Sequence, residues 1–187
     1  PSFYAPSSAT GAVCVDDVEF YAQESVPLDI REACNRGFSD EKEGDNAGGW
    51  TDQGNNNLSG IKAGPLTVQE VPFTIIDPAA NNGKSALILR ASGSPFAKAA
   101  EIACAGSADW IYLLHAAAWA PEGKPVGTMT ITYADNTKAE VSVLSGKTVA
   151  DWWRVNATEA YGVKLEGANP AKLPAHLFAA SIANPGF

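Results

Sequence analysis

Hydrophobic and polar residues alternate along several short stretches of the chain. In the stretch GTMTITY, Met129, Ile131 and Tyr133 share one parity, and threonines occupy the other. The turn sequence ADNT follows and leads into KAEVSVL. Alternation with a period of two, bounded by turn residues, is typical of β-strands. The pattern therefore predicts a hairpin with strands over residues 128–133 and 139–144.

Three further stretches are predicted to form strands. VPFTII (71–76) is followed by Asp77-Pro78 and an Asn-Asn-Gly turn, and SALILRA then predicts a returning strand over residues 86–89. WIYLLHAAAW is apolar at both parities, which predicts a central strand over residues 111–117 that is covered on both faces. A buried helix is the alternative for this segment, but its β-branched and aromatic start favours a strand.

The predicted fold class is all-β. In VCVDDVEFY the apolar residues move from odd to even positions at Asp16-Asp17, which indicates a β-bulge. No stretch longer than about ten residues has the 3.6-residue apolar period of a helix. We therefore expect a two-sheet antiparallel β-sandwich, a jelly roll, without internal repeats.

Composition and charge exclude several classes of function. The chain has 187 residues, of which 45% are apolar and 18% charged, so one soluble domain is expected. A formal charge of −8 would repel a phosphate backbone, so we expect no nucleic-acid partner. No apolar run is long enough for a membrane span. The chain opens with PSFYAPSSATG, without an initiator Met or a leader, which suggests a processed or excised piece of a larger protein.

Few residues suggest catalysis. The chain has only two histidines, His115 and His176, and neither lies near a nucleophile motif. A pair of carboxylates for glycoside hydrolysis cannot be recognised from the sequence, because the distance between them is set by the fold. The candidate acids lie in hydrophilic loop sequence. Cys14, Cys34 and Cys104 are too few for a disulfide scaffold, and whether two of them pair is open. We expect a non-enzymatic domain.

Tryptophans are the most distinctive candidates for binding. Trp152 and Trp153 are adjacent, so in a strand one would fill the core and the other would face outward. Indole faces stack on the C–H faces of sugar rings, and neighbouring amides and acids bind the hydroxyls. Trp110 and Trp119 are expected in the core, whereas for Trp50 core and ligand roles remain equally open. The candidate carbohydrate-binding residues are Trp50, Asp52, Gln53, Asn56, Trp152 and Trp153.

A set of ordered phrases resembles a known family. NRGFSDEKEGDNAGGWTDQG, VPFTIIDPAANNGKSALIL, WIYLLHAAAW, ITYADNTKAEVSV, SGKTVADWW and LFAASIANPGF occur in this order. Together they resemble the galactose-binding-like jelly-roll modules appended to secreted bacterial glycoside hydrolases, over residues 26–187. The resemblance implies a non-catalytic module that binds a polysaccharide or oligosaccharide. It also implies a secreted or cell-surface location and a covalently linked catalytic domain.

The two ends of the chain depart from this family. Similar modules continue past the NP phrase into another strand, whereas this chain stops at Phe187. Residues 1–25 resemble the closing strand of a different jelly roll. They are either the tail of a preceding module or a strand that completes this sandwich. The second is favoured because an open slot would leave unpaired backbone groups on a sheet edge.

The polar loop over residues 35–60 is the candidate metal site. Its acids, amides and glycines offer the hard oxygen donors of which calcium takes six to eight. The resemblance implies a structural calcium near a sheet edge, and the candidate ligands are Asp40, Asp45 and Asp52. The spacing does not match the EF-hand loop. The alternative is a solvated loop anchored by Trp50, in which Asp52 and Gln53 cap backbone groups.

Three classes of function follow from these patterns. The first is a carbohydrate-binding module that keeps a polysaccharide-degrading enzyme near its substrate by raising its effective concentration. The second is a structural or interdomain module without a glycan site, and the third is an enzyme on a jelly roll. An exposed coplanar aromatic pair or a shallow groove would favour the first, a large apolar patch without polar binding groups the second, and converging carboxylates in a deep cleft the third.

Overall fold

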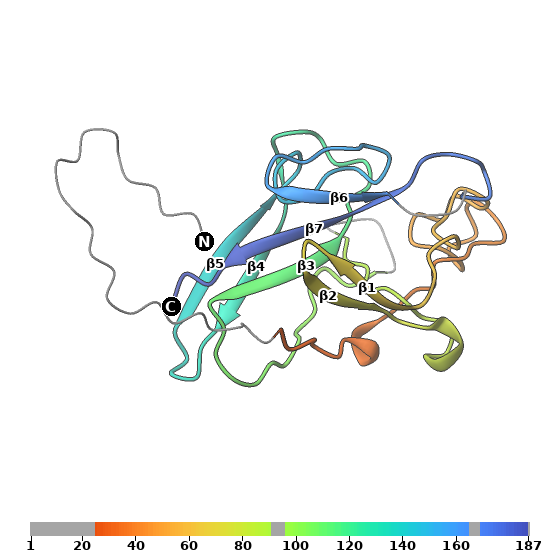
Figure 1. Ribbon diagram of the computed structural model, residues 1–187. Helices are drawn as coiled ribbons and strands as arrows, with labels where there is room; N and C mark the ends of the chain where they lie inside the picture. Colours follow the sequence, from red (N-terminus) through yellow and green to blue (C-terminus); the bar gives the residue numbers. More distant parts are fainter. Residues whose placement is uncertain (1–24, 91–95, 165–168, 187) are drawn as a thin grey trace.

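The computed structural model describes residues 25–90, 96–164 and 169–186 (Figure 1). Within these ranges the regular structure is antiparallel β, with two short 3-10 turns, η1 (Arg31–Ala33) and η2 (Pro78–Ala80), and no α-helix. The all-β prediction is confirmed at this level. The predicted bulge at Asp16-Asp17, Cys14 and nearly all of the segment 1–25 lie outside the described residues.

The hairpin of β4 (Pro125–Thr132) and β5 (Lys138–Leu144) confirms the first strand prediction. The strands pair antiparallel with Met129 opposite Val141. Asp135 Oδ1 accepts hydrogen bonds from the backbone N–H and the hydroxyl of Thr137, and Asn136 has a φ of 68°. Asn and Asp tolerate this left-handed backbone and close tight turns, which explains the reversal at ADNT.

The predicted pairing of residues 71–76 with residues 86–89 is wrong. β2 (Val71–Ile75) forms as expected, but it pairs with the preceding β1 (Gly64–Val68) through a two-residue turn at Gln69 and Glu70. β1 was not predicted, because its GPLTV sequence begins with Gly and Pro, which are typical of loops.

Residues 86–89 do not form a strand. Asp77 caps η2 by accepting a hydrogen bond from Ala79 N at 2.9 Å, and this turn carries the chain away from β2. Ala86 makes only an isolated bridge with Arg36. The side chain of Asn35 exchanges two hydrogen bonds with the backbone of Ile88, at 2.8 and 2.9 Å. A side-chain amide therefore satisfies backbone groups that a strand partner would have used.

A three-stranded sheet has the order β3-β7-β6. β3 (Trp110–His115) is an edge strand of this sheet rather than the predicted central strand, and β7 (His176–Ala183) is central, with β6 (Ala160–Lys164) on its other side. The strand prediction over 111–117 holds as far as His115, and Ala117 adds an isolated bridge. The apolar run of β3 is typical of a strand covered on both faces, but Trp110 and Tyr112 point to an uncovered part of the sheet face.

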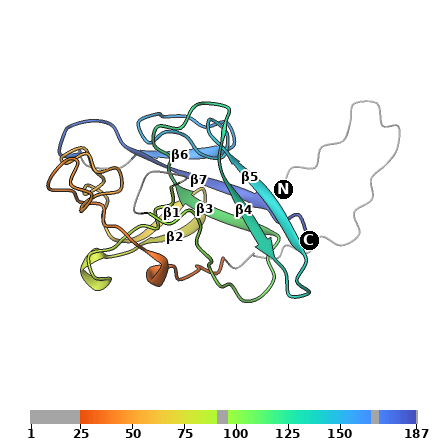
Figure 2. The same ribbon diagram turned by 180° about the vertical axis from the view of Figure 1, so that it is seen from behind.

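Two core clusters cover the central strand from opposite sides. Leu177 packs with Trp152, Ile75 and other buried residues, and the β1–β2 hairpin contributes to this cluster. The neighbouring Phe178, which is fully buried, packs with Val149 and Ala150, and β5 contributes to this second cluster. Consecutive strand residues face opposite sides of a sheet. The arrangement of hairpins around the sheet is visible from both sides (Figures 1 and 2) and is consistent with a β-sandwich.

Candidate functional site

The loop over residues 35–60 folds around the carboxylate of Asp40. Asp40 is buried, and its oxygens accept hydrogen bonds from Gly54 N at 2.8 Å and Lys42 N at 3.1 Å. Gly48 and Gly49 pass so close that an added Cβ at either would lie within 2.8 Å of an Asp40 atom. Real Cβ atoms do not approach so closely, so the glycines of this loop allow the chain to wrap tightly around one acid.

Asp40, Asp45 and Asp52 come together in space. One carboxylate oxygen from each lies within 4.8 Å of the others. Asp45 also accepts a hydrogen bond from Ala47 N at 2.8 Å, and Asp52 accepts one from Asn46 N at 3.1 Å. In the described part of the chain, none of the three forms an ion pair with a lysine or arginine. The predicted set of acids is therefore a real cluster, and its negative charge has no such counter-ion.

The oxygen atoms beside this cluster fit a hard cation. Asp52 Oδ1, Gln53 Oε1 and Thr51 Oγ1 are buried without a hydrogen-bond partner. A buried polar atom without a partner costs about 1–3 kcal/mol, so such groups call for an explanation. Carboxylate and amide oxygens are the ligands that calcium prefers. The alternative of a loop in which Asp52 and Gln53 cap backbone groups holds for Asp52, which accepts from Asn46 N, but Gln53 Oε1 has no partner.

Trp50 anchors the loop to the core. Its ring is partly buried, and its centroid lies 5.2 Å from that of Trp152 in an edge-to-face arrangement. The other candidate binding residues of this loop also have inward contacts. Asp52 Oδ1 and Gln53 Oε1 are buried, and Asn56 Oδ1 accepts a hydrogen bond from Asn169 Nδ2 at 2.8 Å. All four of these residues are half-buried, so they do not form an open sugar-binding surface.

The adjacent tryptophans have opposite environments. Trp152 is 2% exposed, whereas Trp153 is 44% exposed. They lie in a turn and not in the predicted strand; Trp152 N donates to Ala117 O at 2.9 Å, and Trp152 O accepts from His176 N at 2.8 Å. Trp152 is therefore a core residue, and listing it as a carbohydrate ligand is corrected. Trp153 is the member of the pair that can meet a ligand.

Trp110 and Trp119 are not in the core, contrary to expectation. Trp110 is 44% exposed because it lies on the open face of edge strand β3. Trp119 is 64% exposed and has a φ of 54°. The only sequence signal for its exposure is the APEGKP segment that follows it, in which Pro and Gly indicate a loop.

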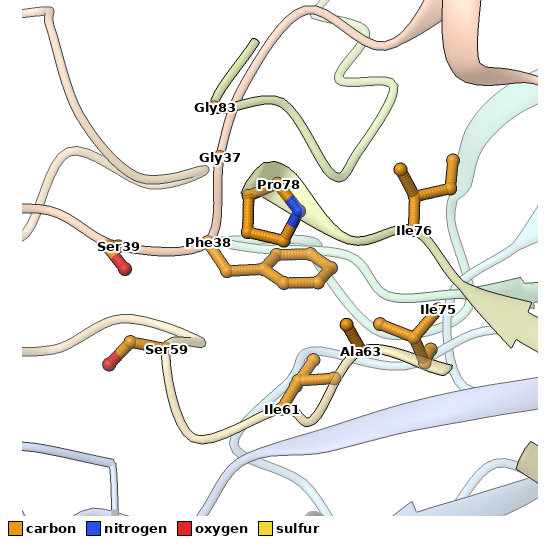
Figure 3. Close-up of a pocket in the computed structure, with 10 residues that line it drawn as sticks. All are labelled: Gly37, Phe38, Ser39, Ser59, Ile61, Ala63, Ile75, Ile76, Pro78 and Gly83. Atoms are coloured by element: carbon orange, nitrogen blue, oxygen red, sulfur yellow. The ribbon is translucent and has the colours of Figure 1, made fainter. Parts of the chain in front are cut away.

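A small apolar hollow lies at the base of the 35–60 loop. Its volume is about 110 Å³, and Figure 3 shows the Phe38 ring beneath Pro78 and beside Ile61 and Ala63. Ligand pockets usually have volumes of roughly 300–1,000 Å³. No titratable side chain lines the hollow. It is too small for a sugar ring with its hydroxyls and has no group for acid–base chemistry.

Both histidines lie in strands. His115 Nε2 donates to Thr148 O at 2.8 Å, and burial lowers the pKa of the imidazole. His176 is 2% exposed. In the described residues, no serine or cysteine is hydrogen-bonded to either ring. Cys34 and Cys104 are free thiols, and burial raises the pKa of Cys34.

Comparisons of the chain with protein families, with curated proteins and with solved structures found no match. Within the described ranges, no helix has both the length and the apolar character needed to cross a membrane. The function is therefore inferred from the geometry of this chain.

Proposed function

We propose that the protein is a non-catalytic carbohydrate-binding module. The observation that carries the proposal is the exposure of two tryptophans outside the strands, Trp119 and Trp153, at 64% and 44%. Tryptophan side chains are mostly buried in folded proteins, and exposed ones provide flat surfaces for ligands with C–H faces. Neutral sugars suit such surfaces on a protein with a net charge of −8, whereas nucleic acids do not.

The module would act by attachment to a polysaccharide-degrading catalytic domain in a secreted or cell-surface bacterial protein. Weak binding at an exposed indole is useful when it is linked to a second domain, because the link raises the local concentration of that domain at its substrate. The observed antiparallel hairpins and three-stranded sheet are consistent with the jelly roll that this proposal includes.

A specific observation favours the alternative of an interdomain module. Trp110 and Tyr112 of β3 and Tyr161 of β6 share one face of the sheet, as the register with β7 shows, and all are between 37% and 53% exposed. A neighbouring domain packed on this face would bury all three. Apolar patches of this kind mark interaction surfaces.

We propose that Asp40, Asp45 and Asp52 bind a structural calcium ion. The cation would offset the charge of the carboxylate cluster and hold together a loop that lacks regular structure. The support is the convergence of three carboxylates and the buried oxygens without partners next to them in sequence.

Affinity electrophoresis tests the binding function directly. The chain is run through native polyacrylamide gels that contain hydroxyethylcellulose, xyloglucan, galactomannan, arabinoxylan, alginate or polygalacturonate, with a gel without polysaccharide as the control. We expect retardation in at least one neutral gel. If the chain migrates as in the control in every gel, the proposal is wrong, and the interdomain alternative gains support.

A further inference from the structure

Trp119 is held in an unusual backbone conformation at the protein surface. Its φ of 54° lies in the left-handed region, where a bulky residue is an outlier. Strained residues persist only where the surroundings hold them in place, and they concentrate at functional sites. The indole is 64% exposed, so burial of the ring does not explain why tryptophan occupies this position.

One carboxylate fixes the backbones of both exposed tryptophans on this side of the fold. Asp151 Oδ2 accepts a hydrogen bond from Trp119 N at 2.8 Å, and Asp151 Oδ1 accepts one from Trp153 N at 3.1 Å. Hydrogen bonds to an ionised acceptor are stronger than neutral ones. Because each oxygen of the carboxylate binds one tryptophan, the two residues are positioned by a single side chain.

Further contacts join the two segments that carry these residues. Ala117 N donates to Ala150 O at 3.1 Å, and Trp152 N donates to Ala117 O at 2.9 Å. Beyond the tryptophans, Arg154 pairs with Glu122. The segment after β3 and the segment after β5 therefore form one unit, at the upper rim of the molecule in both ribbon views (Figures 1 and 2).

We infer that Trp119 and Trp153 form a two-tryptophan site for a neutral oligosaccharide, positioned by Asp151. The inference rests on the proposed function and names the place where it occurs. Two preset indoles with water-exposed surface can stack on two sugar rings without the cost of ordering a loop. The two segments carry three acids and three bases, Glu122, Asp151 and Glu159 against Lys124, Lys147 and Arg154, so the unit has no excess positive charge that would favour an acidic glycan over a neutral one.

Only Trp153 of this pair was predicted as a binding residue from the sequence. Trp153 was a candidate because of its neighbour Trp152, but Trp119 lies 34 positions earlier and was assigned to the core. Asp151 was not singled out, because a carboxylate that accepts two backbone N–H groups has no sequence signature.

The test uses the four neutral polysaccharide gels with Trp119→Ala, Trp153→Ala and Trp110→Ala. Trp110 is the matched control, because it is as exposed as Trp153 but lies on the three-stranded sheet. We expect each of the first two variants to lose at least about fivefold in affinity, as for a ligand-contacting hot spot, and Trp110→Ala to stay within about twofold. Thermal melts check that all three variants remain folded.

The outcomes separate this inference from the proposed function. If the wild-type chain is retarded but Trp119→Ala binds equally well, the two-tryptophan site is wrong while the binding function stands. The same holds if Trp110→Ala alone loses binding. Retardation only in alginate or polygalacturonate also overturns the neutral site. If the wild-type chain is retarded in no gel, both the function and the site fail.

The positioning role of Asp151 has its own readout. Asp151→Asn leaves only one acceptor for two backbone N–H groups, so we expect weaker binding in the wild-type background. In the Trp119→Ala/Trp153→Ala background the same substitution should change affinity no further, because Asp151 acts through the two rings. An equal loss in both backgrounds would show that Asp151 acts independently of the tryptophans.

Discussion

At the scale of single residues, the WW dipeptide shows how position decides the role of a side chain. Trp152 is fixed by backbone hydrogen bonds to Ala117 and His176, and its ring packs against Leu177 and Ile75. The backbone of Trp153 is fixed by Asp151, and its ring contacts that of Trp152 on one side and solvent on the other. The two indoles should therefore contribute to different properties of the protein, Trp152 to stability and Trp153 to the proposed binding.

Substitution of the two tryptophans should separate these contributions. We expect Trp152→Ala to lower the free energy of unfolding by about 3–5 kcal/mol, because it leaves a large cavity in the core. Trp153→Ala should change it by less than about 0.5 kcal/mol, as is usual for surface substitutions. Urea denaturation followed by circular dichroism measures both values. Equal losses for the two variants would contradict the assigned environments.

The sequence predicts the residue-scale picture only in part. It anticipated that one member of the WW pair is buried, and it chose the right three acids for the cluster, because flexible glycines between hydrophilic acids allow them to converge. It failed for Trp119, which lies in the loop after β3, and for Trp110, since exposure of a strand aromatic depends on which sheet face remains uncovered. That property follows from strand order and not from local periodicity.

At the scale of elements, the β1–β2 turn departs from the preferred chemistry. Gln69 and Glu70 have φ values of 50° and 66°, the left-handed backbone that a two-residue type I′ turn requires. Asn-Gly is the preferred sequence there, because Asn tolerates this region and Gly has no Cβ. The hairpin is stabilised by its packing against the core, whereas its turn sequence destabilises the hairpin.

The double substitution Gln69→Asn/Glu70→Gly should therefore stabilise the protein. We expect a gain of roughly 0.5–1 kcal/mol in the free energy of unfolding, measured by denaturant titration. Asn136→Gly in the β4–β5 turn is the control, with a smaller gain, because Asn already tolerates its φ of 68°. A loss of stability in the double variant would argue against the described turn.

Strands were predictable where alternation and turn residues agreed, as in β2, β4 and β5. The partner of β2 was not, because two neighbours, GPLTV before it and SALILRA after it, could each pair with it. Asp77 and Asn35 decide the outcome by capping η2 and by bonding the Ile88 backbone. Such side-chain-to-backbone contacts between distant residues leave no periodic signal.

At the scale of the whole molecule, the 35–60 loop connects distant parts of the chain. Trp50 reaches the core cluster, and Asn35 bonds the backbone of Ile88. Asn56 bonds Asn169, and Asn55 O accepts from Ala171 N at 3.0 Å, close to the start of β7. A cation that orders this loop would therefore stabilise the entire fold and not only one surface segment.

Removal of calcium should lower the melting temperature. An ion that binds only the folded state stabilises it by about 3 kcal/mol at a hundredfold excess over Kd, which corresponds to about 6–12 °C for a domain of this size. Differential scanning calorimetry with 1 mM calcium and with excess EGTA measures this shift. An unchanged melting temperature would contradict the proposed site.

Two variants make the calcium test specific to the cluster. Asp45→Asn keeps an acceptor for Ala47 N but removes one carboxylate from the cluster, so the calcium-dependent shift should shrink or vanish. Glu41→Gln removes one charge from the same loop outside the cluster and should keep the full shift. If both variants lose the shift equally, general loop charge and not a defined site is responsible.

The contacts among Trp50, Trp152 and Trp153 have an optical consequence. Their centroids follow one another at 5.2 and 5.6 Å, with interplanar angles of 83° and 35°. Indole transitions at such separations couple, so the chain should carry a strong near-ultraviolet circular dichroism signal that belongs to the three rings together. Because the series runs from the acidic loop through the core to the surface, one spectrum can report on events at both of its ends.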